Sequence, residues 1–137
     1  MNVVIAIDSL KGSLSSMEAG YAIKEGIKKV SPTANVTIRP LADGGEGTVE
    51  ALVDGMNGTL KEVVVTGPLG HPVTCSYGIL SKSQTALIEM SGAAGITLIT
   101  ADERNPLHTT TYGVGEVIKD AITNGCRKFI IGIGGSA

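Results

Sequence analysis

Three polar, glycine-containing segments hold most of the residues that could do chemistry, and each follows a run of aliphatic residues. They are residues 8–13 (DSLKGS), 43–48 (DGGEGT) and 132–136 (GIGGS). An aliphatic run that ends in such a loop is typical of a strand in an open α/β sheet, where ligands bind at the carboxyl ends of the strands. The recurrence of this pattern predicts that these loops bind a ligand.

In the first loop, Asp8 ends an aliphatic run and Lys11 follows three residues later, just before an expected helix. A lysine at this place is a mobile positive charge for a phosphate, and small residues let backbone amides approach an anion. Alternatively, Asp8 caps its own turn and Lys11 is solvated. The loop lacks the GxxxxGK[ST] pattern, so the residues alone leave both interpretations open. The candidate residues of this loop are Asp8, Ser9, Lys11, Gly12 and Ser13.

In the second loop, Asp43 and Glu46 lie three residues apart around Gly44 and Gly45. A carboxylate can act as a general base toward a hydroxyl or as a ligand for the Mg²⁺ that accompanies a nucleotide. The glycines allow close approach of the backbone to a ligand. The same spacing also fits a capping box at a helix N-terminus, and both interpretations can hold together.

The third loop, with Gly134, Gly135 and Ser136, has the composition of a turn that cradles phosphate. Tight packing alone would equally explain its glycines, and a single glycine-rich turn does not decide between the two interpretations. Glu89 is a further candidate because it closes an apolar run. A carboxylate at the end of a buried strand needs a partner or a ligand.

Composition describes a globular protein that acts on something small. The chain has 137 residues, of which 42% are hydrophobic and 18% charged, and its net charge is -2. Without a basic stripe, neither nucleic acid nor an anionic membrane is expected as a partner. The apolar run at residues 3–7 is too short for a signal peptide or a membrane span, so we expect a cytoplasmic protein. Cys75 and Cys126 have no metal-ligand spacing and are predicted to be structural thiols.

The order of the apolar patterns predicts an α/β fold. Strand, helix, strand and helix alternate first, which requires parallel pairing through crossover connections. Three strand candidates without intervening helices then favour a hairpin or a mixed sheet. We therefore expect a Rossmann-like parallel sheet with helices in residues 1–68 and the start of a second, mixed-sheet α/β domain in residues 69–137. The expected strands are 3–7, 35–39, 60–65, 73–80, 85–89 and 128–133, and the expected helices are 16–29, one opening at 43–46, and one following 109–111.

Taken together, these segments resemble the bacterial glycerate kinase family of type 1 over the whole chain. The order and spacing of several short runs are what make the resemblance specific. The runs are 8–14 (DSLKGSL), 42–48 (ADGGEGT), 67–70 (GPLG), 88–90 (IEM), 105–107 (NPL) with 110–113 (TTYG), and 132–137 (GIGGSA).

The resemblance implies transfer of the γ-phosphoryl group of ATP to a hydroxyl of D-glycerate, with Mg²⁺, in a cleft between two α/β domains. It assigns charge compensation to Lys11, and it gives Asp43 the orientation or deprotonation of the acceptor hydroxyl, or the binding of Mg²⁺. Asp8 and Glu46 are further catalytic candidates. Gly44 with Gly45, and residues 134–136, would cradle anions with their amides.

The resemblance also implies that family members are longer than this chain, so we expect an N-terminal portion that stops inside a glycine-rich loop. A second function class stays open: a catalytically silent α/β module that binds a small anion or associates with itself through the edge of an incomplete sheet. Half of a dinucleotide-binding dehydrogenase is disfavoured, because no GxGxxG follows the first strand.

Overall fold

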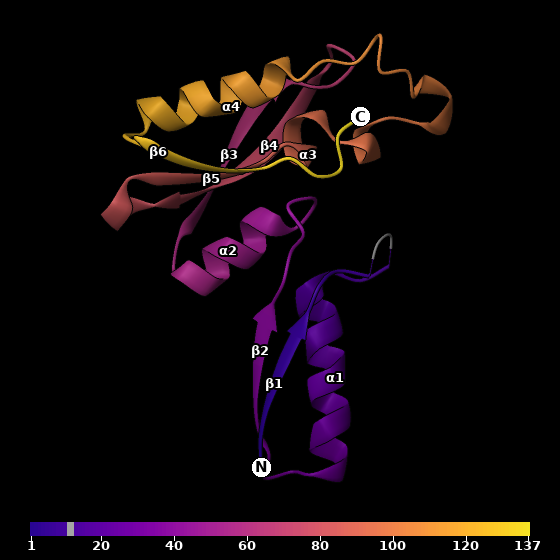
Figure 1. Ribbon diagram of the computed structural model, residues 1–137, viewed down its shortest axis with the longest axis vertical. Helices are drawn as coiled ribbons and strands as arrows, with labels where there is room; N and C mark the ends of the chain where they lie inside the picture. The colour runs from indigo at the N-terminus through magenta and orange to yellow at the C-terminus, as the bar shows by residue number, and fades with distance from the viewer. Residues whose placement is uncertain (11–12) are drawn as a thin grey trace. The chain divides into compact units, whose positions relative to one another are not determined.

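The computed structural model describes residues 1–10 and 13–137, which divide into two compact units, Met1–Asp43 and Gly44–Ala137 (Figure 1). The predictions for Lys11 and Gly12 lie outside the described residues.

The first unit is a strand, a helix and a strand. Strands β1 (Asn2–Ile7) and β2 (Asn35–Pro40) pair in parallel along their full length, and α1 (Ser16–Val30) connects them. Helix α1 begins at a capping box, in which the Ser15 hydroxyl accepts from the Glu18 N–H and the Glu18 carboxylate accepts from the Ser15 N–H. Both the parallel pairing and this helix start confirm the prediction from the sequence.

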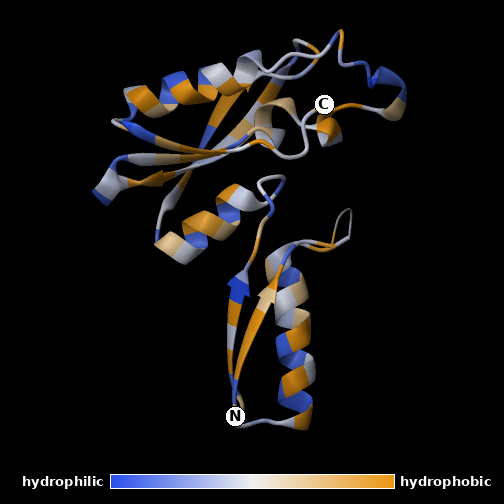
Figure 2. Ribbon diagram, viewed as in Figure 1, coloured by the Kyte–Doolittle hydropathy of each residue, from blue (hydrophilic) through white to orange (hydrophobic). Residues whose placement is uncertain are grey.

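The core of the first unit lies between α1 and one face of this sheet. Ile5, Ala34 and Val36 form its buried centre, and Figure 2 shows the aliphatic strand residues in orange. Helix and sheet approach closely at Gly20, where an added Cβ would lie 2.6 Å from a methyl group of Ile38. A larger residue at position 20 would therefore push the helix away from the sheet.

The second unit is built on a four-stranded mixed sheet with the order β3-β4-β5-β6. The first two pairings are antiparallel, and β5 pairs with β6 in parallel. This arrangement confirms the predicted mixed sheet. The strands are β3 (Thr59–Thr66), β4 (Pro72–Leu80), β5 (Thr85–Glu89) and β6 (Lys128–Gly132).

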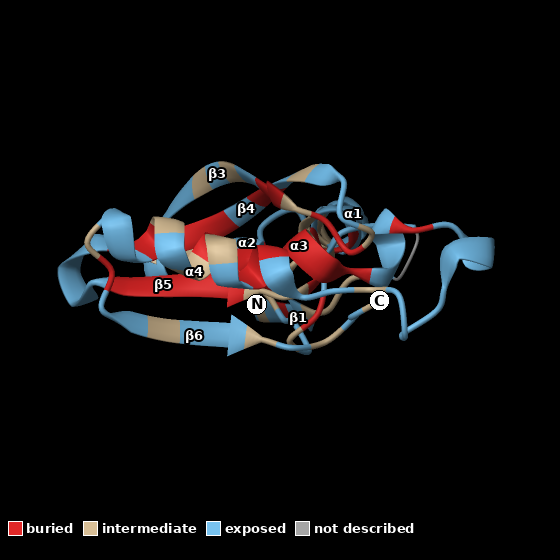
Figure 3. Ribbon diagram, turned by 90° about the horizontal axis from the view of Figure 1, so that it is seen from above, coloured by how far each residue is buried: buried red, intermediate tan, exposed pale blue. Residues whose placement is uncertain are grey.

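Helices cover both faces of this sheet. Helix α2 (Thr48–Met56) packs on one face, and α3 (Ser91–Ala94) and α4 (Tyr112–Thr123) lie on the other (Figure 1). Figure 3 shows β5 as buried along almost its whole length and β6, at the sheet edge, as largely exposed. In the described residues, no helix is long and apolar enough to cross a membrane. Short 3₁₀ turns at Ser81–Ser83, Ile96–Leu98 and Ala101–Glu103 complete the unit.

The start of α2 differs from the expectation. The predicted helix opening at residues 43–46, with its capping box, is wrong, because α2 begins at Thr48 and Gly47 is its N-cap without a side-chain cap. Gly44 and Gly47 adopt φ angles of 94° and 86°, which a right-handed helix does not contain. The loop therefore forms a turn before the helix starts.

The compact units also divide at a different place from the expected domains. Helix α2 packs on β4 and β5, so residues 44–68 belong to the compact second unit. The domain boundary expected after residue 68 stays a prediction.

Candidate functional site

The second and third glycine-rich loops meet in the second unit. The Gly134 N–H donates to the Gly44 carbonyl at 2.9 Å. A Cβ added at Gly132 would lie 2.5 Å from the Gly44 oxygen, and one added at Gly134 would lie 2.8 Å from the Gly45 nitrogen. The two backbones are thus in direct contact, and packing alone requires glycine at positions 132 and 134. We call this contact, made by residues 44–45 and 132–134, the glycine junction.

The turn beside the glycine junction carries an open backbone amide. Gly135 has a φ of 70°, and both Gly135 and Ser136 are exposed. The turn is held in place by two backbone hydrogen bonds. The Ile96 N–H donates to the Gly135 carbonyl and the Ala137 N–H donates to the Ala94 carbonyl, each at 2.9 Å. The Gly135 N–H meets no acceptor among the described residues, whereas Gly134 and Gly135 form a hydrogen-bonded turn that closes at Ser136. A free amide at a left-handed turn can bind an anion.

Glu89 lies at the end of β5, and its side chain binds the N-terminus of α2. Its carboxylate accepts a hydrogen bond from the Val49 N–H at 3.0 Å and also interacts with the amides of Gly47 and Thr48. Burial raises the pKa of the Glu89 carboxyl above its ordinary value, and these backbone hydrogen bonds oppose the rise. The sequence indicated that this carboxylate needed a partner but not which one.

Two buried hydroxyl groups near the same place have no partner among the described residues. They belong to Thr48, which is 9% exposed, and Ser91, which is 6% exposed. The Ser91 Cβ lies 3.5 Å from the position that a Cβ on Gly135 would take. Sequence reasoning did not single out either hydroxyl; the available signal was their position directly after a glycine-rich loop and after a strand end.

The candidate residues of the first loop belong to the first unit. The Asp8 carboxylate accepts from the Ser9 N–H at 2.7 Å, which is the local turn cap that the sequence left open as an alternative. The Ser13 N–H donates to the Leu10 carbonyl at 2.7 Å. Asp43 is exposed at the end of this unit, and Glu46 is exposed in the second unit.

The described residues hold no group of three or more His, Cys, Asp or Glu side chains that could bind a metal ion by themselves. In kinase sites Mg²⁺ is usually held by one or two carboxylates together with substrate phosphates and water. Asp43 and Glu46 have the chemistry for such a ligand.

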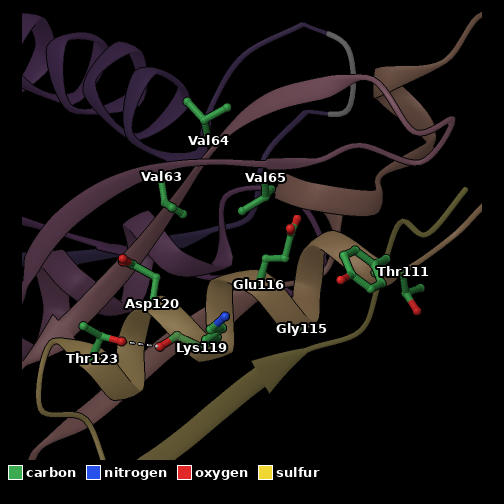
Figure 4. A pocket seen from close by; sticks show the side chains of 10 residues that line it. Val63, Val64, Val65, Thr111, Gly115, Glu116, Lys119, Asp120 and Thr123 are labelled. Carbon is green, nitrogen blue, oxygen red and sulfur yellow. Dashed lines mark hydrogen bonds between the residues drawn. The ribbon is translucent and has the colours of Figure 1, made fainter.

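A groove of about 560 Å³ lies elsewhere, between β3 and α4 (Figure 4). None of the predicted site residues lines it. Two carboxylates that line it are bound within the protein: the Asp120 carboxylate accepts from the Tyr77 hydroxyl at 2.7 Å and from Lys61 Nζ at 3.0 Å, and the Glu116 carboxylate accepts from the Thr66 N–H at 2.6 Å. The hydrogen bond from Tyr77, followed by Lys61, lowers the pKa of the Asp120 carboxyl. These hydrogen bonds attach α4 to the sheet, so we assign them a structural role.

Comparison with known proteins decides the family. The model of the glycerate kinase family matches residues 3–137. The chain belongs to the glycerate kinase family. It is 53% identical over 137 residues to a glycerate kinase of Bacillus subtilis and 48% identical over the same length to a glycerate 2-kinase of Escherichia coli. A crystal structure from Salmonella typhimurium LT2, of a protein proposed to be glycerate kinase 2, matches 99% of the chain with a TM-score of 0.80 and 48% identity.

The chain spans 36% of the length of each of these three relatives. Membership of the glycerate kinase family and the α/β class are thereby confirmed. The roles expected for individual site residues refer to the activity of a whole protein, and for this chain they remain a proposal.

Proposed function

We propose that this chain contributes to an ATP-dependent glycerate kinase that phosphorylates a hydroxyl group of D-glycerate. One observation carries the proposal: about half of all positions, over the entire chain, are identical to proteins named glycerate kinase. Phosphoryl transfer needs little covalent chemistry from the protein, which mainly positions the substrates and stabilises charge. A rigid backbone with open amides and nearby polar side chains suits that task.

In the second unit, the Gly135 and Ser136 amides are proposed to bind a phosphate or carboxylate oxygen. The glycine junction holds this turn against the Gly44–Gly45 turn, so the amides are fixed in place before a ligand arrives. Glu46 is exposed and follows Gly44 and Gly45 directly in the sequence. It is proposed to act on the acceptor hydroxyl or on Mg²⁺.

In the first unit, Lys11 is proposed to compensate phosphate or carboxylate charge, and Asp43 to orient or deprotonate the acceptor hydroxyl or to bind Mg²⁺. Asp8 is proposed as a further catalytic residue, and Ser9, Gly12 and Ser13 are proposed to bind substrate or phosphate. The Asp8 carboxylate also accepts from the Ser9 N–H and so helps to shape the loop.

A chimera tests the proposal. This chain replaces the matching 137 residues of the E. coli glycerate 2-kinase, to which it is 48% identical, and glycerate-dependent consumption of ATP is measured with Mg²⁺. We expect turnover, and we expect Lys11→Ala and Asp43→Asn to reduce it by about 100-fold or more, the scale on which catalytic groups act. Lys119→Ala, an exposed change on α4, is the matched control and should leave turnover unchanged.

A chimera that folds but consumes no ATP would contradict the kinase function for this chain. The silent anion-binding or self-associating module would then be favoured. That module would be indicated by a dimer mass of the 137-residue chain in solution, or by binding of phosphate without turnover.

A further inference from the structure

The strongest unassigned feature of the second unit is the way in which Glu89 holds the N-terminus of α2. A helix leaves its first four N–H groups without partners inside the helix. Most helices satisfy one of them with a side chain at the N-cap, but the N-cap here is Gly47, which has none. The carboxylate that takes up these amides comes from β5, forty residues further along the chain.

The same segment of β5 is fixed to the third glycine-rich loop. Directly after Glu89, the Met90 N–H donates to the Gly132 carbonyl at 2.8 Å. Two consecutive residues therefore bind the two halves of the glycine junction: the Glu89 side chain binds the helix that follows Gly44 and Gly45, and the Met90 backbone binds the strand end that carries Gly132.

The charge of Glu89 argues against a direct contact with substrate phosphate. Its carboxylate already lies on the amides that would otherwise attract an anion to the start of α2, and a phosphate there would meet a negative charge. The open amide of Gly135 is free of that conflict. The Thr48 hydroxyl is buried in the first turn of α2 and has no partner among the described residues, so it does not replace Glu89 as a cap.

We propose that Glu89 is a positioning residue: by binding the first amides of α2, its side chain holds the Gly44–Gly45 turn against Gly132–Gly134 and so fixes the glycine junction. This assignment differs from the substrate- or phosphate-binding role predicted for Glu89 from the sequence, where it was a carboxylate in need of a partner or a ligand. Its importance for substrate binding rests on the proposed kinase function, whereas its effect on the junction does not.

Amide hydrogen exchange of the 137-residue chain, resolved by residue, tests the positioning role. In Glu89→Ala, exchange is expected to become about tenfold faster or more at Val49, which loses its acceptor, and at Gly134, whose N–H donates to Gly44. Glu89→Gln keeps an acceptor oxygen and is expected to restore most of the protection at both amides.

Glu116→Ala is the matched control. Glu116 also accepts from a distant backbone amide, that of Thr66, but lies in the groove between β3 and α4. Its loss should speed exchange at Thr66 and leave Gly134 unchanged. Wild-type protection of Gly134 in Glu89→Ala would overturn the proposal, as would equal loss at Gly134 in Glu116→Ala. If Glu89→Ala does not fold, Glu89→Asp, which withdraws the carboxylate by one methylene group, is measured for the same two amides.

The chimeric kinase separates this inference from the proposed function. Glu89→Ala is expected to raise the KM for ATP or for D-glycerate about tenfold with a smaller change in kcat, because a displaced turn binds the phosphate or carboxylate group more weakly. Glu116→Ala should leave the KM unchanged. An inactive parent chimera would contradict the proposed function while the exchange result still decides on Glu89. An active chimera in which both variants have the same KM would overturn the positioning role at the site.

Discussion

The second unit attaches a helix to each face of its sheet, and the two attachments are built differently. Helix α4 is held to β3 and β4 by side chains, through Glu116 and the group of Asp120, Tyr77 and Lys61. Helix α2 is held at its N-terminus by Glu89, and the loop before it touches another loop backbone to backbone. The groove at α4 is lined by none of the predicted site residues, whereas the backbone contact ends in a turn where the Gly135 N–H meets no acceptor among the described residues. The difference separates a scaffold from a candidate site.

The largest effect is expected where the backbones touch. In Gly132→Ala, the new Cβ would lie 2.5 Å from the Gly44 oxygen, so one of the two loops must move. We expect a loss of about 1–3 kcal/mol in the free energy of unfolding, the usual cost of overpacking, and loss of activity in the chimera. Urea denaturation of the chain measures the first and the ATP assay the second.

Gly115→Ala provides the control for that change. Gly115 lies inside α4, with open space where its Cβ would be. Alanine should stabilise the helix by up to about 1 kcal/mol. Equal denaturation midpoints for the two alanine variants would show that the glycine junction is looser than its geometry indicates.

A smaller effect is expected on the α4 side. The Tyr77 side chain is fully buried, and its hydroxyl donates to Asp120. Tyr77→Phe removes one hydrogen bond but leaves Asp120 with Lys61, so we expect a loss of about 1 kcal/mol in the free energy of unfolding, measured by urea denaturation. Tyr112→Phe, at a residue that is 67% exposed, should change nothing measurable. Unchanged stability in Tyr77→Phe would mean that packing alone holds α4.

The fold was largely predictable because most of its signals are local. Alternating helices and strands indicated the parallel pairing of β1 and β2, and the three consecutive strand patterns indicated the mixed sheet. The capping box at Ser15 and Glu18 and the left-handed Gly125 after α4 are also encoded within a few residues.

The candidate site was predictable only in its parts. The spacing of Asp43 and Glu46 suggested a capping box, but the true cap of α2 is Glu89, and no spacing rule connects residues forty positions apart. The contact of Gly44 with Gly132 and Gly134 depends on β5 and β6 being neighbours in the sheet. The sequence identified Glu89 as a carboxylate in need of a partner, since burial of a charge is costly, and left the identity of that partner to the tertiary structure.

The smallest expected effect is a difference in pH dependence between the two attachments. The pKa of Asp120 is lowered, chiefly by the hydrogen bond from Tyr77 and then by Lys61, so its contribution to stability is present above the ordinary aspartate value of about 3.9 and is lost as the pH falls through the lowered pKa. The pKa of Glu89 is raised, chiefly by burial. Its contribution is therefore complete below the ordinary glutamate value of about 4.3 and is lost as the pH rises through the raised pKa.

The stability lost in Asp120→Asn, relative to wild type, should accordingly shrink as the pH falls below about 4, whereas that lost in Glu89→Gln should shrink as the pH rises above about 4.3. Urea denaturation of the wild type and of the two variants is measured between pH 3 and pH 7, at about one point per half unit of pH. It gives the slope of each stability loss against pH. The charge of Glu50 on α2 helps to raise the pKa of Glu89, so the comparison is repeated in a Glu50→Gln background. The Cys75 thiol, whose pKa burial raises to about 11, stays neutral throughout. Slopes of the same sign would mean that Glu89 is stabilised by the amides of α2 more than it is penalised by burial. The attachment of α2 would then be electrostatically of the same kind as that of α4, and the glycine junction alone would distinguish the two faces of the sheet.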